Sequence, residues 1–559
     1  MNKPLKPDSE DTNIKNQSLN YPSWILTDRQ ICDLELLMNG GFNPLNGFMN
    51  SEDYFSVIKN MRLSNGALWP IPIILDVDEK FSNSLSAGDK VTLKDKEGFP
   101  LAVLNISDKW KPDYEKEAKE VYGTTDQSHP GVSYLINING SYCLGGSIDK
   151  ISLPHHYDFQ NNRHTPLLLK KILKKNKWDK VVAFQTRNPM HRAHVKMTLD
   201  AMKELNANLL IHPAVGQTKL GDIDYFTRVR CYRLIMEQYP LNSSMLSLLP
   251  LSMRMCGPRE AIWHALIRKN YGCTHLIIGR DHAGPGINSL GKPFYGPYDA
   301  QNLVKDYQKE IGIEMVPFKT LVYVPKIKKY KPLEEINKKV KYKNISGTEL
   351  RLLIRKGEEI PSWFTFDKVA EELKKSTPPL IKRGFTIFFT GLSGSGKSTL
   401  ANGLMIKFLE EGSKPVTLLD GDIVRTNLSS ELGFSKKDRS INVRRIGFVA
   451  SEITKNGGVA ICAPIAPYES DRLSNRKLIS QHGVFIEVYV KTPLHVCEKR
   501  DPKGLYKLAR RGDLKKFTGI SDPYEEPKKA EIVIDSSIIS PSKLVEKIFG
   551  KIRKLGLVN

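Results

Sequence analysis

The sequence predicts an α/β protein of several domains, and three observations support this. Two motifs typical of phosphate handling, 185–194 and 391–398, lie about two hundred residues apart. Each follows a short apolar run of the kind that forms a buried parallel strand, and helix-like segments alternate with such runs around both. The chain of 559 residues is also too long for one hydrophobic core.

The composition is that of an ordinary globular protein, with 40% hydrophobic and 26% charged residues. No run approaches the ~18 apolar residues of a membrane span, and the polar first twenty residues carry no secretion or import signal. We therefore expect a cytoplasmic protein without a membrane partner. Seven scattered cysteines without a Cys-x-x-Cys pair argue against structural zinc and against disulfides.

The net charge of +23 favours polyanionic partners, either nucleic acid or small anions such as ATP, pyrophosphate and sulfate. Eight lysines gather in 326–343, offset by Glu334 and Glu335. That segment lacks aromatic residues spaced for base stacking, so we expect small anions and no nucleic acid. The alternative, a nucleic-acid adenylyltransferase or RNA kinase, would bind RNA tightly and in a salt-dependent way.

Four segments follow one another along the chain. Residues 1–160 show a strand-and-turn rhythm that predicts a β-rich domain, and 161–320 alternate strands with helices as a doubly wound parallel sheet does. Residues 321–378 form a small lysine-rich connecting domain, and 379–559 a P-loop domain. The expected strands are 68–75, 90–93, 101–106, 181–184, 209–212, 274–279 and 385–390, with a helix at 194–205.

The motif at 391–398 is a complete P-loop between a strand and a helix. Its glycines let backbone amides turn towards phosphate oxygens, and Lys397 supplies a cation for the β and γ phosphates. Ser398 supplies a hydroxyl for Mg²⁺, the metal expected with ATP. The residues expected to bind ATP are Gly391, Leu392, Ser393, Gly394, Ser395, Gly396, Lys397, Ser398 and Thr399.

Further motifs follow the P-loop: 419–425, 432–442, 501–506 and 517–524. Two acids just after a strand, with arginines nearby, suit a site that holds Mg²⁺, a hydroxyl acceptor and an anionic substrate. With these motifs, residues 383–559 resemble adenylylsulfate kinase. The resemblance implies that Asp420 and Asp422 organise Mg²⁺ and the ribose 3′-hydroxyl, with Asp422 as the base.

The same resemblance implies a substrate pocket for adenylyl sulfate. It assigns the phosphosulfate to Arg425, Arg439 and Asn442, the adenine to Phe434 and Phe517, and the rest of the acceptor pocket to Ile465 and Lys503. The sequence departs from the family at Ile423, Ser440, Ile441 and Glu469. Ala466 stands where some members carry a phosphorylatable serine, so a phosphoserine intermediate is excluded there.

His191 and His194 lie three residues apart, on one face of a helix. A zinc site would need a third ligand, and none is evident. Charge stabilisation on nucleotide phosphates is favoured, because Arg187 and Asn188 precede the histidines directly after a strand. Further segments accompany this motif, at 212–216, 257–260 and 279–286.

Together these segments resemble sulfate adenylyltransferase (ATP sulfurylase) over about residues 20–375, with Cys256 in place of an alanine found in many members. The resemblance implies a PUA-like N-terminal domain, then a Rossmann-like nucleotidyltransferase domain, a small connecting domain and the P-loop kinase domain. It places the catalytic turn at Thr186, Arg187 and Asn188, transition-state stabilisation at His191 and His194, sulfate at Gln185, Arg187 and Ala283, and ATP at Gly279, Arg280, Asp281, His282 and Leu321.

The two resemblances combine into one expected function, a bifunctional enzyme that makes 3′-phosphoadenylyl sulfate (PAPS) from sulfate and two ATP, with adenylyl sulfate as the intermediate. The domain order is similar to that of bacterial fusions, and the families imply a homo-oligomer. Fungal sulfurylases share this order but have a degenerate kinase-like domain, so a non-catalytic module that binds PAPS as an allosteric effector is the main alternative. Neither resemblance implies zinc, flavin or nicotinamide.

Overall fold

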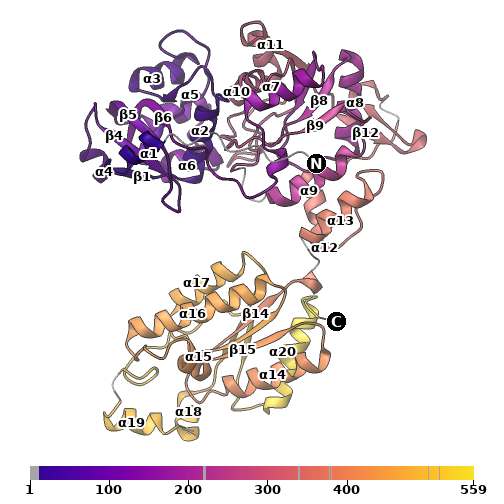
Figure 1. The fold of residues 1–559 in the computed structure, drawn as a ribbon. Helices are drawn as coiled ribbons and strands as arrows, with labels where there is room; N and C mark the ends of the chain where they lie inside the picture. The colour runs from indigo at the N-terminus through magenta and orange to yellow at the C-terminus, as the bar shows by residue number, and fades with distance from the viewer. Residues whose placement is uncertain are drawn as a thin grey trace. The chain divides into compact units, whose positions relative to one another are not determined.

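The computed structural model describes residues 12–217, 222–337, 340–376, 378, 380–501, 503–514 and 516–558. The chain forms two compact units, Met1–Ser346 with Ile360–Leu373, and Gly347–Glu359 with Lys374–Asn559 (Figure 1). The finer four-domain division stays a prediction, and Pro379 at its last boundary lies outside the described residues. No described helix combines the length and hydropathy needed to cross a membrane.

The first unit begins with a six-stranded sheet, the N-terminal sheet, in the order β1-β4-β5-β6-β2, with β3 also paired to β6. Only the β1–β4 pair is parallel. Its strands are β1 (Ser23–Ile25), β2 (Gly47–Phe48), β3 (Leu75–Val77), β4 (Lys90–Lys94), β5 (Pro100–Trp110) and β6 (Tyr142–Lys150). The helices are α1 (Thr12–Ser18), α2 (Asp28–Asn39), α3 (Ser51–Asn60), α4 (Glu79–Asn83), α5 (Tyr114–Val121) and α6 (Pro130–Asn137).

The expected strand at 68–75 is wrong except at its last residue, Leu75, where β3 begins. The apolar side chains of this run are buried as a strand would bury them. Pro70 and Pro72 lack the backbone N–H that a central strand must donate, so the segment is buried without joining the sheet.

The rest of the first unit contains a five-stranded parallel sheet, the central sheet, in the order β11-β10-β7-β8-β9. Its strands are β7 (Val181–Phe184), β8 (Asn208–Ile211), β9 (Ser244–Leu246), β10 (His275–Ile278) and β11 (Glu314–Pro317). The accompanying helices are η1 (Gln160–Asn162), α7 (Pro166–Lys175), α8 (Arg192–Leu205), α9 (Tyr225–Met236), α10 (Gly257–Asn270), α11 (Asp299–Ile311) and α13 (Asp367–Ser376).

The order of the central sheet creates a topological switch point between β7 and β10. The chain winds from β7 outwards through β8 to β9, then crosses back to β10 on the other side of β7. Ile277 of β10 pairs with Phe184 of β7, so the two strands end side by side. Ligands of such sheets bind outside the carboxyl ends of the strands at this point.

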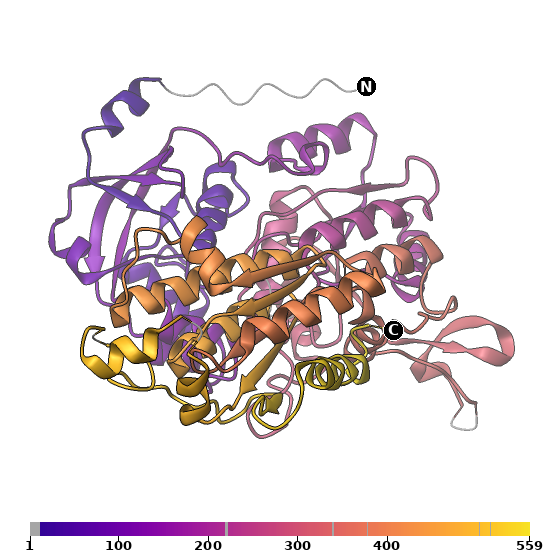
Figure 2. The ribbon, with the colours of Figure 1, turned by 90° about the horizontal axis from the view of Figure 1, so that it is seen from below.

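A two-stranded antiparallel hairpin follows the central sheet, formed by β12 (Leu321–Val324) and β13 (Lys329–Pro332). The short helices η2 (Pro325–Ile327) and η3 (Leu333–Glu335) flank β13. Figure 2 shows this hairpin, in pink, at the edge of its unit. The ring of Trp363 stacks on Tyr323 at 5.1 Å between centroids, which ties the segment before α13 to the hairpin.

The second unit is built on a five-stranded parallel sheet, the C-terminal sheet, in the order β15-β16-β14-β17-β18. Its strands are β14 (Phe385–Thr390), β15 (Val416–Asp420), β16 (Val459–Ala463), β17 (Val484–Val490) and β18 (Ile532–Ile534). The helices are α12 (Gly347–Lys356), η4 (Leu380–Lys382), α14 (Lys397–Glu411), α15 (Gly421–Asn427), α16 (Lys436–Lys455), α17 (Glu469–Ile479), α18 (Leu494–Arg500), α19 (Leu505–Arg511) and α20 (Pro541–Lys554).

Helices cover both faces of the C-terminal sheet, with α16 and α17 on one face and α14 and α20 on the other (Figure 1). The central strand β14 is buried at every residue, as its apolar sequence predicts for a parallel strand between two helical layers. The P-loop leaves the carboxyl end of this strand, again at the switch point of the sheet.

A buried ion pair joins α2 to the loop before α10. Arg254 Nη2 donates to Asp33 Oδ2 at 2.5 Å, and both side chains are at least 96% buried. Arg254 also donates to the carbonyl of Ser252 at 2.7 Å. Loss of one partner from a buried pair leaves an uncompensated charge in the core, which is strongly destabilising.

We therefore expect Asp33→Ala to destabilise the first unit by about 3–5 kcal/mol. Lys96→Ala is the matched control, because it removes an exposed pair with Asp28 on the same helix and should cost under ~1 kcal/mol. All six tryptophans belong to the first unit, so tryptophan fluorescence during urea unfolding reports on this unit alone. Equal midpoints for the two variants would contradict the structural role of the pair.

Candidate active sites

The first candidate site begins at the turn between β7 and α8. Thr186 fixes this turn, because its hydroxyl accepts the N–H of Asn188 at 3.1 Å and donates to the Asn188 carbonyl at 2.9 Å. The Tyr232 hydroxyl of α9 donates to the same carbonyl at 2.8 Å. The predicted catalytic turn is thus held rigidly at the carboxyl end of β7.

His194 presents one defined nitrogen towards a ligand. Its Nδ1 accepts the backbone N–H of His191 at 3.1 Å, which also caps the start of α8. Burial lowers the pKa of His194 to about 4, so the ring is neutral near pH 7. A neutral imidazole that accepts at Nδ1 carries its proton on Nε2. His194 can therefore donate one hydrogen bond to a phosphate oxygen.

His191 is held by a segment far along the chain. Its Nδ1 lies 3.1 Å from the Thr365 hydroxyl, and its ring packs on Phe364 at 4.3 Å between centroids. Burial, aided by the neighbouring His194, lowers the pKa of His191 well below its usual range. The sequence motifs gave no sign of this support, because Thr365 lies 174 residues from His191.

Arg187 connects the turn after β7 to the loop after β10. Its Nη1 forms an ion pair with Asp222 at 2.6 Å, and its Nη2 donates to the Gly284 carbonyl at 3.4 Å. The neighbouring Gln185 is buried, and its Oε1 has no hydrogen-bond partner among the described residues. A buried unpaired amide oxygen is costly, which fits a group that meets a ligand or water.

The loop after β10, residues 279–286, contains all but one of the other residues predicted to bind ATP and sulfate. Asp281 and Ala283 have positive φ angles of 52° and 53°, and the Ala283 carbonyl accepts the N–H of Gly257 at 3.3 Å. Arg280 and Asp281 are exposed, whereas His282 is buried. The last predicted residue, Leu321, begins β12 and pairs with Pro332 across the hairpin.

The second candidate site is the P-loop between β14 and α14. Gly394 and Gly396 have φ angles of 72° and 94°, in the left-handed region that glycine adopts most readily. Gly396 is the N-cap of α14, so the amino end of this helix faces the space enclosed by the loop. Two residues far along the chain support the loop: Ser536 donates to the Ser395 carbonyl, and Arg500 donates to the Gly394 carbonyl. Sequence reasoning missed both residues.

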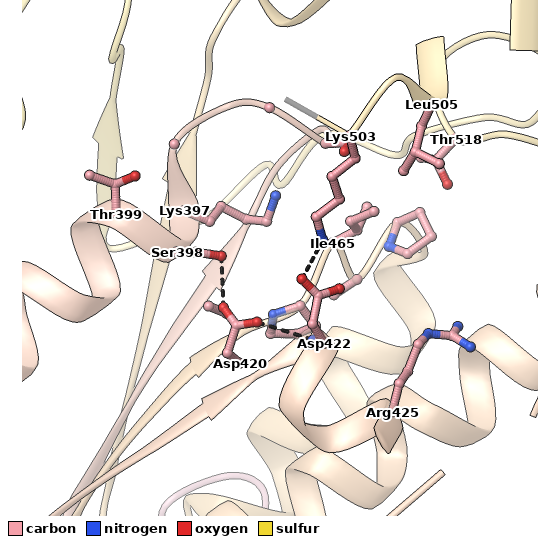
Figure 3. Close-up of a pocket in the computed structure, with 18 of the residues that line it drawn as sticks. Lys397, Ser398, Thr399, Asp420, Asp422, Arg425, Ile465, Lys503, Leu505 and Thr518 are labelled. Atoms are coloured by element: carbon pink, nitrogen blue, oxygen red, sulfur yellow. Dashed lines mark hydrogen bonds and ion pairs between the residues drawn. The ribbon is translucent and has the colours of Figure 1, made fainter. Parts of the chain in front are cut away.

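Lys397, Ser398 and Asp420 converge beside the P-loop (Figure 3). The Ser398 hydroxyl donates to Asp420 Oδ2 at 2.7 Å, and Lys397 Nζ donates to the Leu392 carbonyl at 2.8 Å. Burial lowers the pKa of Lys397 to about 8, although Asp420 and Asp422 oppose the shift. A hydroxyl next to a carboxylate matches the oxygen ligands that Mg²⁺ prefers, so these residues fit the metal.

Asp422, the predicted base, lies two residues after Asp420, in the first turn of α15. Its backbone N–H donates to Asp420 Oδ1 at 3.0 Å, and its carboxylate pairs with Lys503 Nζ (Figure 3). Both side chains of this pair are exposed. Arg425 lies on the same helix, donates to the Gly433 carbonyl at 3.1 Å and stacks over the ring of Phe434 at 4.4 Å.

Arg439 and Asn442 lie on the inner face of α16, and both are buried. Arg439 forms an ion pair with Asp522 at 2.6 Å and donates to the Thr518 hydroxyl at 2.7 Å. Its Nε and the Oδ1 of Asn442 have no hydrogen-bond partner among the described residues. The pair with Asp522 was not predicted, and it orients a guanidinium whose remaining N–H is unsatisfied.

A cavity of about 1080 Å³ brings most predicted residues of this half together. Phe434 and Phe517 both line it, although Phe434 is 63% exposed and Phe517 only 9%. Gly391, Leu392 and Ser395 of the P-loop do not line it. The predicted residues that do are Ser393, Gly394, Gly396, Lys397, Ser398, Thr399, Asp420, Asp422, Arg425, Phe434, Arg439, Asn442, Ile465, Lys503 and Phe517.

These features define a class, a nucleotidyltransferase-like unit and a P-loop kinase unit in one chain. Family models agree: the PUA-like domain matches residues 1–153, ATP-sulfurylase 160–376 and adenylylsulphate kinase 383–535. Sulfate adenylyltransferase of Chaetomium globosum is 50% identical over 549 residues, which cover 98% of this chain and 96% of that protein. The enzyme of the same name from Coccidioides immitis is 52% identical over 525 residues, covering 93% and 91%.

A solved structure entitled "Hexameric APS kinase from Thiobacillus denitrificans" covers 98% of this chain and 96% of its own, with 36% identity and a TM-score of 0.80. The chain therefore belongs to the sulfate adenylyltransferase family and carries an adenylylsulfate kinase domain. The protein is an enzyme of sulfate assimilation, with a nucleotidyltransferase domain and a phosphotransferase domain.

The lowered pKa of Lys397 predicts how nucleotide binding to the P-loop depends on pH. Below pH 8 the lysine is protonated and can neutralise phosphate, and above pH 8 the free protein loses that charge. We expect the Kd of a non-hydrolysable ATP analogue at the P-loop to rise about tenfold between pH 7 and pH 9. Calorimetric titration measures this Kd. The same titration of Lys397→Ala gives the signal from binding outside the P-loop, which is subtracted.

The rate of the sulfurylase reaction over the same pH range provides the control. His194 stays neutral from pH 7 to pH 9, so its hydrogen bond to the phosphate should not change. A P-loop Kd that is flat from pH 7 to pH 9 would show that Lys397 keeps its proton in the free protein.

Proposed function

We propose that both units are catalytic and that the chain performs two consecutive reactions: ATP and sulfate give adenylyl sulfate and pyrophosphate, and a second ATP phosphorylates its 3′-hydroxyl to give PAPS. One observation carries the proposal. The P-loop lysine, the Ser398–Asp420 pair and Asp422 line the same cavity as the groups assigned to adenylyl sulfate. This is the arrangement that phosphoryl transfer between two nucleotides requires.

In the first reaction a sulfate oxygen attacks the α phosphorus of ATP, and the bond from that phosphorus to the bridging oxygen of pyrophosphate breaks. Sulfate is already an anion, so no protein base is needed. The chain must instead bring two anions together. Arg187 would orient sulfate, and His194 Nε2–H would stabilise charge on the α phosphate as a neutral donor.

In the second reaction the ribose 3′-oxygen attacks the γ phosphorus, and ADP leaves. Asp422 would accept the hydroxyl proton after releasing Lys503, which is then free to meet phosphate. Lys397 would neutralise the β and γ phosphates in the buried P-loop. Arg439, oriented by Asp522, would bind the phosphosulfate through its unpaired N–H.

Mg²⁺ would be held beside the P-loop by Ser398 and Asp420, where it would offset charge on the phosphates of bound ATP. The two reactions are complementary, because adenylyl sulfate forms unfavourably and its phosphorylation draws the first equilibrium forward. The substrates ATP and sulfate and the products pyrophosphate, adenylyl sulfate and PAPS are all anions, in keeping with a net charge of +23.

The alternative is a sulfurylase whose second unit binds PAPS without catalysis. It is favoured by the relatives, which are named only for the first activity although they match over both units. It is disfavoured by the intact P-loop, because an effector site has no need of a buried lysine beside a metal-binding hydroxyl and carboxylate. We also propose a homo-oligomer, by analogy with the full-length neighbour described as hexameric.

The first experiment supplies ATP, Mg²⁺, labelled sulfate and pyrophosphatase, then separates the labelled nucleotides. Label in PAPS is expected and would establish two active sites in one chain. Label that stops at adenylyl sulfate would favour the regulatory module. Label that remains in sulfate would refute the first reaction.

Single substitutions should separate the two activities. Lys397→Ala is expected to abolish kinase activity on supplied adenylyl sulfate and leave pyrophosphate release unchanged, because it removes only the P-loop cation. His194→Ala is expected to do the reverse, reducing sulfate-dependent pyrophosphate release about 100-fold or more. The two assays on each variant, with circular dichroism to check folding, test this. A folded variant that lost both activities would contradict two independent sites.

A further inference from the structure

Three buried side chains connect α10 to the loop after β10. His282 belongs to the residues predicted to bind ATP, whereas Glu260 and His264 have no role assigned so far. His264 Nδ1 lies 2.9 Å from His282 Nε2, and His264 Nε2 lies 3.4 Å from Oε1 of Glu260. Glu260 and His264 are fully buried on α10, and His282 retains 8% exposure in the loop. The order Glu260–His264–His282 forms a continuous polar path through the core.

The protonation of this path follows from its surroundings. Burial raises the pKa of Glu260, but His264 and the backbone N–H groups of Arg254 and Cys256, at 3.0 and 2.9 Å, outweigh burial and leave that pKa lowered. Burial is the largest influence on both histidines and lowers the pKa of His264 and of His282. Glu260 opposes the shift of His264 without reversing it, and the nearby Arg268 guanidinium lowers the pKa of both rings further. The carboxylate is therefore ionised and both rings are neutral.

The charge on Glu260 fixes the direction of the hydrogen bond between His264 and His282. His264 Nε2 has no hydrogen-bond partner among the described residues, but it lies 3.4 Å from the ionised Glu260 Oε1, and that negative charge favours the proton on this nitrogen. The Nδ1 of His264 must then accept, and the only neutral form of His282 that can donate to it has the proton on Nε2. The Nε2 of His282 is therefore directed into the protein, towards His264, and not outward from the loop.

The loop itself needs such an anchor. His282 lies between Asp281 and Ala283, which both have positive φ, a conformation costly for residues with a side chain. Helix α10 holds the loop at two points, through His264 and through the N–H of Gly257 on the Ala283 carbonyl. Arg187 of the predicted catalytic turn donates to the Gly284 carbonyl, so a change in the conformation of this loop would also affect that turn.

We propose that His264, oriented by Glu260, is a positioning residue that holds His282 as the Nε2–H tautomer and thereby keeps the backbone of 279–284 in its nucleotide-binding shape. The proposal rests on the proposed function in that this loop contacts ATP in the sulfurylase reaction. His282 would then act on nucleotide binding indirectly, because it anchors the backbone of the loop that contacts the nucleotide.

Two substitutions of His264 test the proposal. His264→Phe keeps a buried ring but removes both nitrogens, and His264→Asn keeps an amide oxygen near the position of Nδ1 that can accept from His282. We expect the phenylalanine variant to raise the sulfurylase KM for ATP about tenfold with a smaller change in kcat, and the asparagine variant to restore most of the loss. Kinase activity on supplied adenylyl sulfate should be unchanged in both, as the folding control. Equal losses in the two variants, or none, would overturn the proposal.

Nuclear magnetic resonance of the full chain labelled with ¹⁵N-histidine reads the tautomer directly, with His282→Gln to assign the signal. We expect the Nε2–H pattern in the wild-type and His264→Asn proteins and a different pattern in His264→Phe. A proton on Nδ1 of His282 in the wild-type protein would refute the positioning role of His264 whatever the kinetics. A wild-type protein without sulfurylase activity would refute the proposed function instead, while the tautomer would still decide whether His264 positions His282.

Discussion

The order of the strands in the two parallel sheets is the constraint on which both candidate sites depend. In the central sheet β7 and β10 end side by side, and in the C-terminal sheet β14 ends between β16 and β17. Parallel strands deliver their following turns to the same edge, so segments far apart in the chain meet there. The strands are buried on both faces, so packing in the core fixes their register. The polar turns that follow these strands are therefore also held at fixed positions.

Burial then decides how each turn handles charge. His191 and His194 are desolvated until they are neutral, so they offer directed hydrogen bonds instead of positive charge. Lys397 is also desolvated, but nearby carboxylates and its high intrinsic pKa leave it protonated near pH 7. The first site therefore suits an α phosphate approached by a second anion, and the second suits a γ phosphate that needs a cation at close range.

Three of the predicted anion-binding arginines are oriented by other protein groups. Arg187 is paired with Asp222, Arg439 with Asp522, and Arg425 with backbone carbonyls of its own domain. A guanidinium has five N–H donors, so it can keep such a partner and still present others to a ligand. This arrangement restricts side-chain motion before the substrate arrives, which lowers the entropic cost of forming the complex.

The sequence by itself determined the elements whose chemistry is local. The P-loop and the strand before it form one contiguous segment, in which the glycines set the conformation and Lys397 the role. The turn 185–194 is a second contiguous segment, in which the histidines set the role. The sequence misjudged 68–74, a buried segment that makes isolated backbone hydrogen bonds but does not join the sheet. Only the tertiary structure decided which distant groups support the sites, such as Thr365 behind His191, Asp522 beside Arg439 and His264 behind His282. These contacts depend on how helices pack across a sheet, and no short pattern of residues encodes that geometry.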